Sequence, residues 1–239
     1  MRVYVVWGAV LAILLCNPNR ASAGGVMSPV GTWQTSIKGT DPGVAYLTFS
    51  NDFSFVGYGF SRRSYGMFWF VGTWGNNSAG QVVAGFTQDF IDGSEAGSFK
   101  AKVSGNNKKL SARAKGSIGR LRLLGAPESE PIADISGDWT SRVTVEGRHH
   151  FESYTIAAST NLAGVFDVTG TGLDNTGSFT ISGAMIVNNR NQLAGFTAND
   201  YGGGVVTNSV LGRVRRKGQR LALKGHQSTG GDVKIQAEK

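Results

Sequence analysis

Short runs of alternating apolar and polar residues recur along most of this chain. Phe99–Val103 and Trp139–Val145 alternate cleanly, and Leu110–Lys115 does so more weakly. Because successive side chains in a strand point to opposite faces, each run offers one face to a core and one to water. Gly, Asn and Asp separate the runs, as is typical of tight turns. The pattern predicts an all-β protein, with no helix of three turns.

About eight strands are predicted in each half of the chain. Those of the first half begin near Trp33, Ala45, Phe53, Met67, Val82, Phe99, Leu110 and Ile118. Those of the second half begin near Trp139, His150, Leu162, Phe179, Leu193, Val205, Leu221 and Val233. So many short antiparallel strands in about 100 residues suit a closed barrel or a two-sheet sandwich, because closure removes exposed sheet edges.

Three sequence landmarks recur in the same order in both halves. They are Gly31-Thr-Trp33 with Gly137-Asp-Trp139, VVAGFTQDF (82–90) with LAGFTANDY (193–201), and LSARAKG (110–116) with LALKG (221–225). Their offsets of 106, 110 and 111 residues indicate a tandem duplication. The polar segment GAPESEP (125–131) between the halves is typical of a linker. We therefore predict two tandem antiparallel β-barrel (or sandwich) domains over residues 29–125 and 135–239, joined by a linker over 126–134.

A Gly-x-Trp motif on the first strand of a small antiparallel barrel is similar to that of the lipocalin and avidin group of calycin-type barrels. Here the motif ends at Trp33 and at Trp139. The resemblance implies that each Trp plugs one end of its barrel beneath a basic residue of a late strand. The candidates are Arg113 or Lys115 for the first barrel and Lys224 for the second. The resemblance also implies an interior that either holds a small apolar ligand or is filled by side chains.

The N-terminus has the pattern of a secretory signal peptide. Met1-Arg2 precedes an apolar stretch from Val3 to Cys16, and Ala21-Ser22-Ala23 follows. We expect a signal peptide over residues 1–23, cleaved after Ala23, and a secreted or periplasmic protein, with the outer membrane less favoured. The apolar stretch is shorter than the roughly 20 residues of a membrane-spanning helix. A lipid anchor on Cys16 is an alternative that Leu15, directly before it, disfavours.

Cleavage would remove the single cysteine of the chain, so disulfides could not stabilise the exported protein. Its stability would then come from core burial or from oligomerisation.

Positive charge is concentrated in two equivalent hairpins. The chain after residue 23 has 22 Lys and Arg against 16 Asp and Glu, and 14 of the 22 lie within 99–125 and 212–225, where no acid occurs. A focused positive surface attracts polyanions at long range, although Lys on edge hairpins also blocks aggregation. The expected partners are lipopolysaccharide, anionic polysaccharide or extracellular nucleic acid. The predicted polyanion-binding residues are Lys108, Lys109, Arg113, Arg213, Arg215, Arg216, Lys217 and Arg220.

An aromatic stretch occurs only in the first half. It consists of Tyr58, Phe60, Tyr65, Phe68, Trp69, Phe70 and Trp74. Consecutive bulky residues point to both faces of one strand, so the outer face needs a cover. That cover could be the second domain, another subunit in a homo-oligomer, a stacked sugar ring or lipid. The predicted ligand-binding residues are Trp69, Trp74, Phe68 and Phe70.

No catalytic set is evident in the sequence. The adjacent His149 and His150 would point to opposite faces of a strand, and His226 is the third histidine. Gly-x-Ser-x-Gly and His-Glu-x-x-His do not occur. The pairs Glu146/Glu152 and Asp89/Asp92 could support glycosidase chemistry, although acids in strand proteins usually form turns. We expect a protein that is not an enzyme and that needs neither cofactor nor metal.

These features favour an exported, non-enzymatic binding or envelope-associated β-barrel protein that contacts an anionic polymer or a small apolar ligand. Two alternatives stay open. One is a single 16-stranded outer-membrane barrel, although roughly 13 residues per strand, turns included, is short for membrane spans of about 9–11 residues. The other is a carbohydrate-active enzyme on a barrel scaffold.

Overall fold

The computed structural model describes residues 27–63, 66–90, 93–116 and 119–239. The predicted signal peptide, Cys16, Tyr65, Asp92 and Ile118 lie outside these ranges. Within them, no helix combines the length and the apolar character that crossing a membrane requires.

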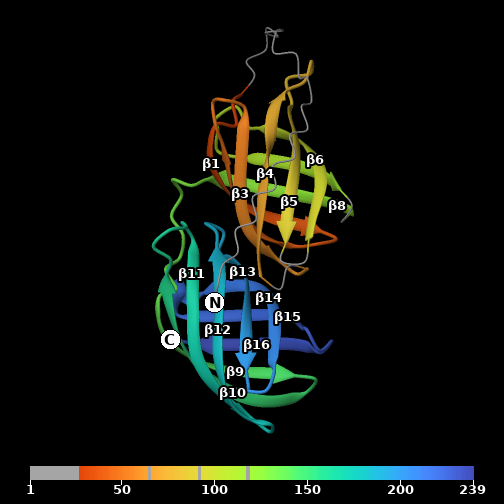
Figure 1. Cartoon of the computed structure of the whole chain (residues 1–239). Helices are drawn as coiled ribbons and strands as arrows, with labels where there is room; N and C mark the ends of the chain where they lie inside the picture. Colours follow the sequence, from red (N-terminus) through yellow and green to blue (C-terminus); the bar gives the residue numbers. More distant parts are fainter. Residues whose placement is uncertain (1–26, 64–65, 91–92, 117–118) are drawn as a thin grey trace.

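The described chain forms two closed antiparallel barrels of eight strands each, one above the other in Figure 1. The first barrel consists of β1 (Gly31–Gly39), β2 (Gly43–Phe49), β3 (Ser54–Ser61), β4 (Met67–Asn76), β5 (Val82–Phe90), β6 (Gly93–Val103), β7 (Leu110–Gly116) and β8 (Gly119–Pro127). The second consists of β9 (Gly137–Val145), β10 (Arg148–Ala158), β11 (Val165–Asp174), β12 (Gly177–Val187), β13 (Gln192–Asp200), β14 (Val205–Arg215), β15 (Arg220–Gln227) and β16 (Asp232–Glu238). A short 3₁₀ turn, Arg216–Gly218, separates β14 from β15.

The predicted fold class, two tandem all-β barrels, is confirmed. Each sheet closes on itself, because β8 pairs with β1 and β16 pairs with β9. The alternative of one 16-stranded barrel is therefore wrong. Every strand except β6 begins within three residues of its predicted start. β6 begins six residues earlier, at Gly93, because Gly93–Ser98 contains no large apolar residue to mark it.

The first barrel is filled by its own side chains. Inward-facing positions carry four phenylalanines whose rings contact one another at centroid distances of 5.2 to 6.5 Å: Phe55, Phe70, Phe86 and Phe99. They leave a cavity of about 10 Å³, about the space of one water molecule. The interior of this barrel is therefore a packed core.

The two leading tryptophans occupy matching environments. Trp33 is 3% exposed and its indole N–H donates to the carbonyl of Pro29 at 2.6 Å. Trp139 is 2% exposed and donates to the carbonyl of Ile135 at 2.8 Å. In both barrels the acceptor lies four residues before the Trp, so the segment that enters the barrel is tied to the indole in the same way.

The basic partner of Trp139 differs from the one predicted. The ammonium of Lys239 lies 5.9 Å from the Trp139 ring, whereas Lys224 is exposed on the outer face of β15. In the first barrel, Arg113 and Lys115 are also exposed, because the alternate residues of β7 point inward. The predicted pairing of Trp33 or Trp139 with these three residues is therefore wrong.

The clearest repeat between the two barrels is a hydrogen-bonded turn, which the sequence comparison missed. Asn77 accepts from the N–H groups of Ala79 and Gln81, and its amide donates to the Gln81 side chain at 3.2 Å. Asn188 makes the corresponding bonds with Arg190 and Gln192, 111 residues later. The repeat of this hydrogen-bond pattern supports a common origin for the two barrels.

The Ala-Gly-Phe-Thr echo, in contrast, does not superimpose. Val82 and Leu193 are both buried in their barrel cores and are equivalent at an offset of 111 residues, so the identical letters are displaced by one position. A displacement of one residue turns a side chain to the other face of a strand. Accordingly Phe86 lies inside the first barrel, while Phe196 lies outside the second and packs against Phe60 at 5.8 Å.

Outward-facing residues of the two barrels form a third apolar cluster where the barrels meet. Its fully buried members are Val44, Tyr46, Phe60, Val165, Ile186 and Ala194. The Tyr46 hydroxyl donates to the carbonyl of Val187 at 3.0 Å, and the Tyr58 hydroxyl donates to that of Ala163 at 2.8 Å. The second barrel thus covers the part of the aromatic stretch that lies on β3, Tyr58 and Phe60.

We expect Gly164→Ala to weaken the contact between the barrels. Gly164 has a φ of 70°, and a Cβ atom there would overlap the Tyr46 hydroxyl. A side chain in this left-handed region costs about 1–2 kcal/mol even without an overlap. Calorimetry should show a lower or split unfolding transition. Gly202→Ala is the matched control, because its φ is 79° but a Cβ atom would meet nothing within 4 Å. Identical thermograms for the two variants would contradict the assignment.

Candidate functional site

Four basic side chains form a row across four neighbouring strands of the first barrel, here called the basic row. The strand register places Lys100 opposite Arg113, Arg113 opposite Arg122, and Arg122 opposite Lys38. All four are exposed on the outer face. Side chains directly opposite each other have Cβ atoms about 4.5–5.5 Å apart, so the charges are close neighbours.

Further positive charge flanks the basic row. Lys115 lies opposite Arg120, and Lys102 follows Lys100 on the same face of β6. None of these seven residues forms an ion pair with a carboxylate of the described chain. Like charges opposite each other destabilise a sheet. Fold stability therefore gives no reason for the arrangement.

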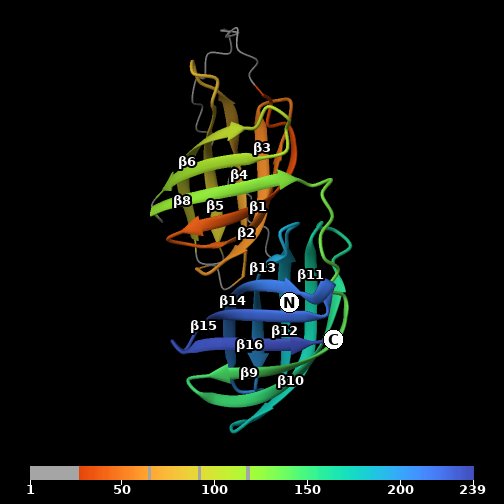
Figure 2. The same ribbon diagram turned by 180° about the vertical axis from the view of Figure 1, so that it is seen from behind.

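The second barrel carries a looser version of this surface. Lys224 lies opposite Lys234, and Arg215 lies opposite Arg220. Here one charge is balanced, because Arg220 forms an ion pair with Glu238 at 3.3 Å. Figure 2 shows β6, β8 and β1 of the first barrel and β14, β15, β16 and β9 of the second facing the viewer, so both basic faces lie on one side of the molecule.

The predicted polyanion-binding residues fall into two groups. Arg113 belongs to the basic row, and Arg213, Arg215 and Arg220 lie on the outer face of β14 and β15. The others occupy exposed turns: Lys108 and Lys109 between β6 and β7, and Arg216 and Lys217 in the 3₁₀ turn. Sequence reasoning missed Lys38, because only barrel closure brings β1 next to β8.

The four predicted ligand-binding aromatics do not share a face. Phe68 and Phe70 are 0% and 4% exposed and point into the first barrel, and Trp74 is buried with its indole N–H bonded to the carbonyl of Ser50. Trp69 is 43% exposed on the outside, next to Tyr58. The predicted platform is therefore wrong as a joint surface, since neighbouring residues of a strand alternate between core and exterior.

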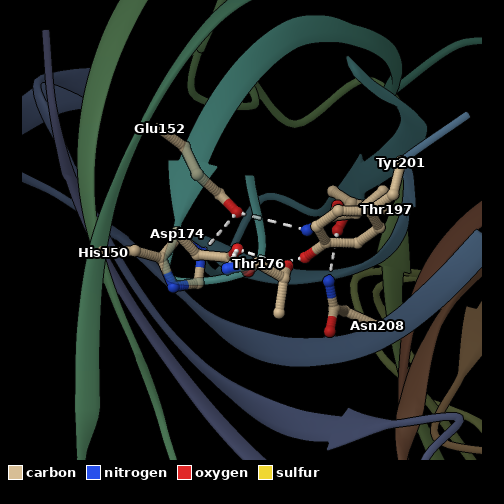
Figure 3. Close-up of polar contacts among 8 residues, drawn as sticks. His150, Glu152, Asp174, Thr176, Thr197, Tyr201 and Asn208 are labelled. Carbon is tan, nitrogen blue, oxygen red and sulfur yellow. Dashed lines mark hydrogen bonds and ion pairs between the residues drawn. The ribbon is translucent and has the colours of Figure 1, made fainter. Parts of the chain in front are cut away.

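A second candidate site lies inside the second barrel, toward the end opposite Trp139, and is here called the polar mouth (Figure 3). It consists of His150, Glu152, Asp174, Thr176, Thr197, Asn199, Tyr201 and Asn208. Glu152 is 5% exposed. One of its carboxylate oxygens lies 3.1 Å from His150 Nε2 and accepts from the Asn199 amide at 3.4 Å. The Asn208 amide donates to Thr197 at 3.1 Å.

At the rim of the polar mouth, Asp174 gathers three hydrogen bonds. The Tyr201 hydroxyl donates to Oδ2 at 2.7 Å, and the N–H and hydroxyl of Thr176 donate to Oδ1 at 2.7 and 2.6 Å. Burial raises the pKa of Asp174, but the bonds from Thr176 and Tyr201 outweigh it and hold the pKa below its usual value. Burial, followed by the bond to Asp174, raises the pKa of Tyr201 to about 12.

We expect Asp174 to make the free energy of unfolding depend on pH in the acidic range. Its lowered pKa in the folded state means that its contribution is present above the unfolded value of about 3.9 and is lost as the pH falls through the folded value. Asp174→Asn should therefore reduce the decline of the urea midpoint between about pH 5 and pH 2. Asp167→Asn, at an exposed position of β11, is the control. A decline as steep in Asp174→Asn as in the wild type would contradict this role.

The structure separates Glu146 from Glu152, while the pair Asp89/Asp92 includes a residue outside the described ranges. Glu146 lies in the turn between β9 and β10 with a φ of 49° and is exposed, whereas Glu152 points into the barrel. Asp89 is exposed on β5. His150 is half-buried beside Glu152 rather than in a surface turn, while His149 lies outside and contacts Thr144. The described residues contain no group of three or more His, Cys, Asp or Glu that could hold a metal ion.

Neither the protein-family models nor the curated proteins gave a match to this chain. Among solved structures, a redesigned β-barrel, mFAP1, bound to DFHBI is similar at 14% identity and a TM-score of 0.39, over 44% of this chain and 94% of that one. A DUF3598-family protein of unknown function from Nostoc punctiforme shows 12% identity and a TM-score of 0.26 over 88% and 96%. The Myxococcus xanthus hemagglutinin in complex with a3,a6-mannopentaose shows 13% and 0.19 over 91% and 96%. These similarities concern the β fold alone.

Proposed function

We propose that this chain is an exported, non-enzymatic binding protein that contacts an anionic polymer through the outer basic faces of its two barrels. The basic row carries the proposal. It places four cations side by side on adjacent strands, and none of them is neutralised by a carboxylate of the described chain.

The geometry of the basic row suits a repeating anion. Neighbouring strands are about 4.8 Å apart, so the four charges extend over roughly 14 Å. A sulfate, phosphate or carboxylate of the polymer can lie between two adjacent cations and remove their repulsion. The two arginines add planar donors that bind such oxoanions bidentately, while the two lysines act as point charges.

The second basic face extends the same surface. The contact between the barrels, through Tyr46, Phe60 and their neighbours, keeps the two faces on one side of the molecule. A polymer bound to the first face is held near the second, so the second contact forms at a high effective concentration. The proposal therefore favours a linear polyanion over a single small anion.

Export is part of the proposal and rests on the pattern of residues 1–23. Fractionation of expressing cells and N-terminal sequencing would test it. We expect the mature chain to begin at Gly24 and to leave the cytoplasm. A cytoplasmic protein that retains Met1 would refute this part.

Retention of the purified mature protein on immobilised heparin, lipopolysaccharide and DNA tests the binding. We expect retention at about 50 mM salt and a steep loss as salt rises, because bound polyanions release counterions. A protein that elutes from all three supports at about 50 mM salt would refute polyanion binding.

The other ligand class inferred from the sequence, a small apolar molecule of the lipocalin type, receives less support. The interior of the first barrel has a cavity of only about 10 Å³. The interior of the second barrel is polar around Glu152, Asn199 and Asn208. An apolar ligand would have to displace packed rings in one barrel or leave polar groups unpaired in the other.

A further inference from the structure

The second barrel has polar side chains at interior positions where the first barrel is apolar. The strand register aligns Ala45, Phe86 and Gly97 of the first barrel with Glu152, Thr197 and Asn208 of the second. The first barrel closes without polar side chains at these three positions, although Asn199 corresponds to the buried Gln88, so the shared topology does not require Glu152, Thr197 or Asn208. Burying a carboxylate and amides costs free energy unless each polar atom is paired. The buried polar groups of the polar mouth therefore reduce the free energy of unfolding, and the shared fold does not require them.

Two amide oxygens of the polar mouth have no hydrogen-bond partner within the protein. They belong to Asn199 and Asn208, each of which is 2% exposed. The orientation of the Asn199 amide is fixed, because its nitrogen donates to Glu152 on β10. Since β10 and β13 are not neighbours in the ladder, this bond crosses the interior of the barrel. The unpaired Oδ1 of Asn199 is an acceptor, so a ligand that reaches it must bring a donor.

The charges and the aromatic rings of the polar mouth indicate which kind of donor group a ligand would carry. The eight residues of the polar mouth include two carboxylates, Glu152 and Asp174, and no Lys or Arg. The rings of Phe179 and Tyr201 are 4.8 Å apart, and His150 lies 5.8 Å from Phe179. Carboxylates, amide oxygens and aromatic faces together recognise an organic ammonium group, which carries several N–H donors and a positive charge.

The polar mouth also has a route to solvent. Thr176 is exposed, Asp174 and Tyr201 are half-buried, and Glu152, Asn199 and Asn208 are buried. Tyr201 leads into Gly202-Gly203-Gly204, an exposed loop in which added Cβ atoms would meet nothing within 4 Å.

We propose that the polar mouth binds a small molecule with a primary ammonium group, which enters beside Tyr201 and donates to the carboxylate of Glu152 and the amide oxygen of Asn199. This site is independent of the basic faces, which lie on the outside of the barrels.

Titration of the mature protein with 1,4-diaminobutane tests the proposal, followed by calorimetry and by NMR of the side-chain amides. We expect saturable binding that shifts the Asn199 amide signals, and no binding of glucose or acetate at the same concentrations. Glu152→Gln keeps the shape but removes the charge, and it should weaken binding at least about tenfold. Gln88→Leu is the matched control, because Gln88 occupies the position of Asn199 in the first barrel.

Three results would overturn the proposal: no saturable binding up to about 10 mM diamine, glucose binding in place of the diamine, or equal diamine binding by Glu152→Gln. The first of these would leave water as the occupant that satisfies the two amides. If circular dichroism shows that Glu152→Gln does not fold, Asn199→Leu takes its place and should abolish binding. Unchanged binding by that variant would be equally decisive.

Discussion

The double charge reversal Arg113→Glu/Arg122→Glu is expected to weaken heparin binding by about 30-fold. Two charges change sign, so the net charge falls by four units. Each unit counts as one exposed ion pair of about 0.2–1 kcal/mol, and the sum is about 2 kcal/mol. The slope of log affinity against log salt should also become shallower by about two units. The measurement is a salt series of binding isotherms.

The matched control for this prediction is Arg148→Glu/Arg190→Glu. It changes the net charge equally at two exposed positions that lie outside the basic row. Equal losses in the two double variants would show that net charge, not the basic row, determines binding. A second measurement, the free energy of unfolding of the free protein, should change in the opposite direction to the binding affinity. In the free protein the two new Glu residues still repel each other, but each also faces a cation, Lys100 or Lys38, so the reversal should raise stability slightly, by about 0.2–1 kcal/mol for each of these two new pairs.

Trp33→Ala and Trp139→Ala are each expected to lower the free energy of unfolding by about 3–5 kcal/mol. Both indoles are almost fully buried, and their removal would also leave the carbonyl of Pro29 or Ile135 without its donor. Urea unfolding followed by circular dichroism measures the loss. Trp69→Ala is the control, because Trp69 is 43% exposed, and it should cost less than about 1 kcal/mol. A large loss for one leading Trp and none for the other would contradict the equivalence of the barrels.

The sequence predicted the strands well because most of them have one apolar and one polar face. Apolar residues at every second position, as in Phe99–Val103, identify a strand wherever the chain later places it. Closure into a barrel rather than a sandwich was left open, because it depends on whether β8 reaches β1, and no local pattern encodes that pairing. The same long-range contact explains why Lys38 was not joined to the basic row.

The polar mouth could not be predicted from local patterns. Glu152 follows the apolar Phe151, which is 71% exposed, so the local sequence suggests the opposite facing for these two residues. Only the register shows that Glu152 faces inward and that Asn199, 47 residues later, reaches it across the barrel. The aromatic stretch led to a different wrong prediction, that of a shared ligand-binding surface. Its consecutive rings looked like one surface, but Phe68 and Phe70 belong to the core and Trp69 to the exterior.

The third apolar cluster, where the barrels meet, bears on how the chain evolved. Val44, Tyr46 and Phe60 point away from the core of their own barrel, where a solitary barrel would carry residues that tolerate water. A half produced alone should therefore self-associate or precipitate, and splitting the gene at the linker should not yield two independent modules. The ancestral barrel can be accounted for in two ways. Either it formed a dimer with an identical copy before the two genes fused, or it acquired these outward-facing apolar residues after fusion, when the second barrel already covered them.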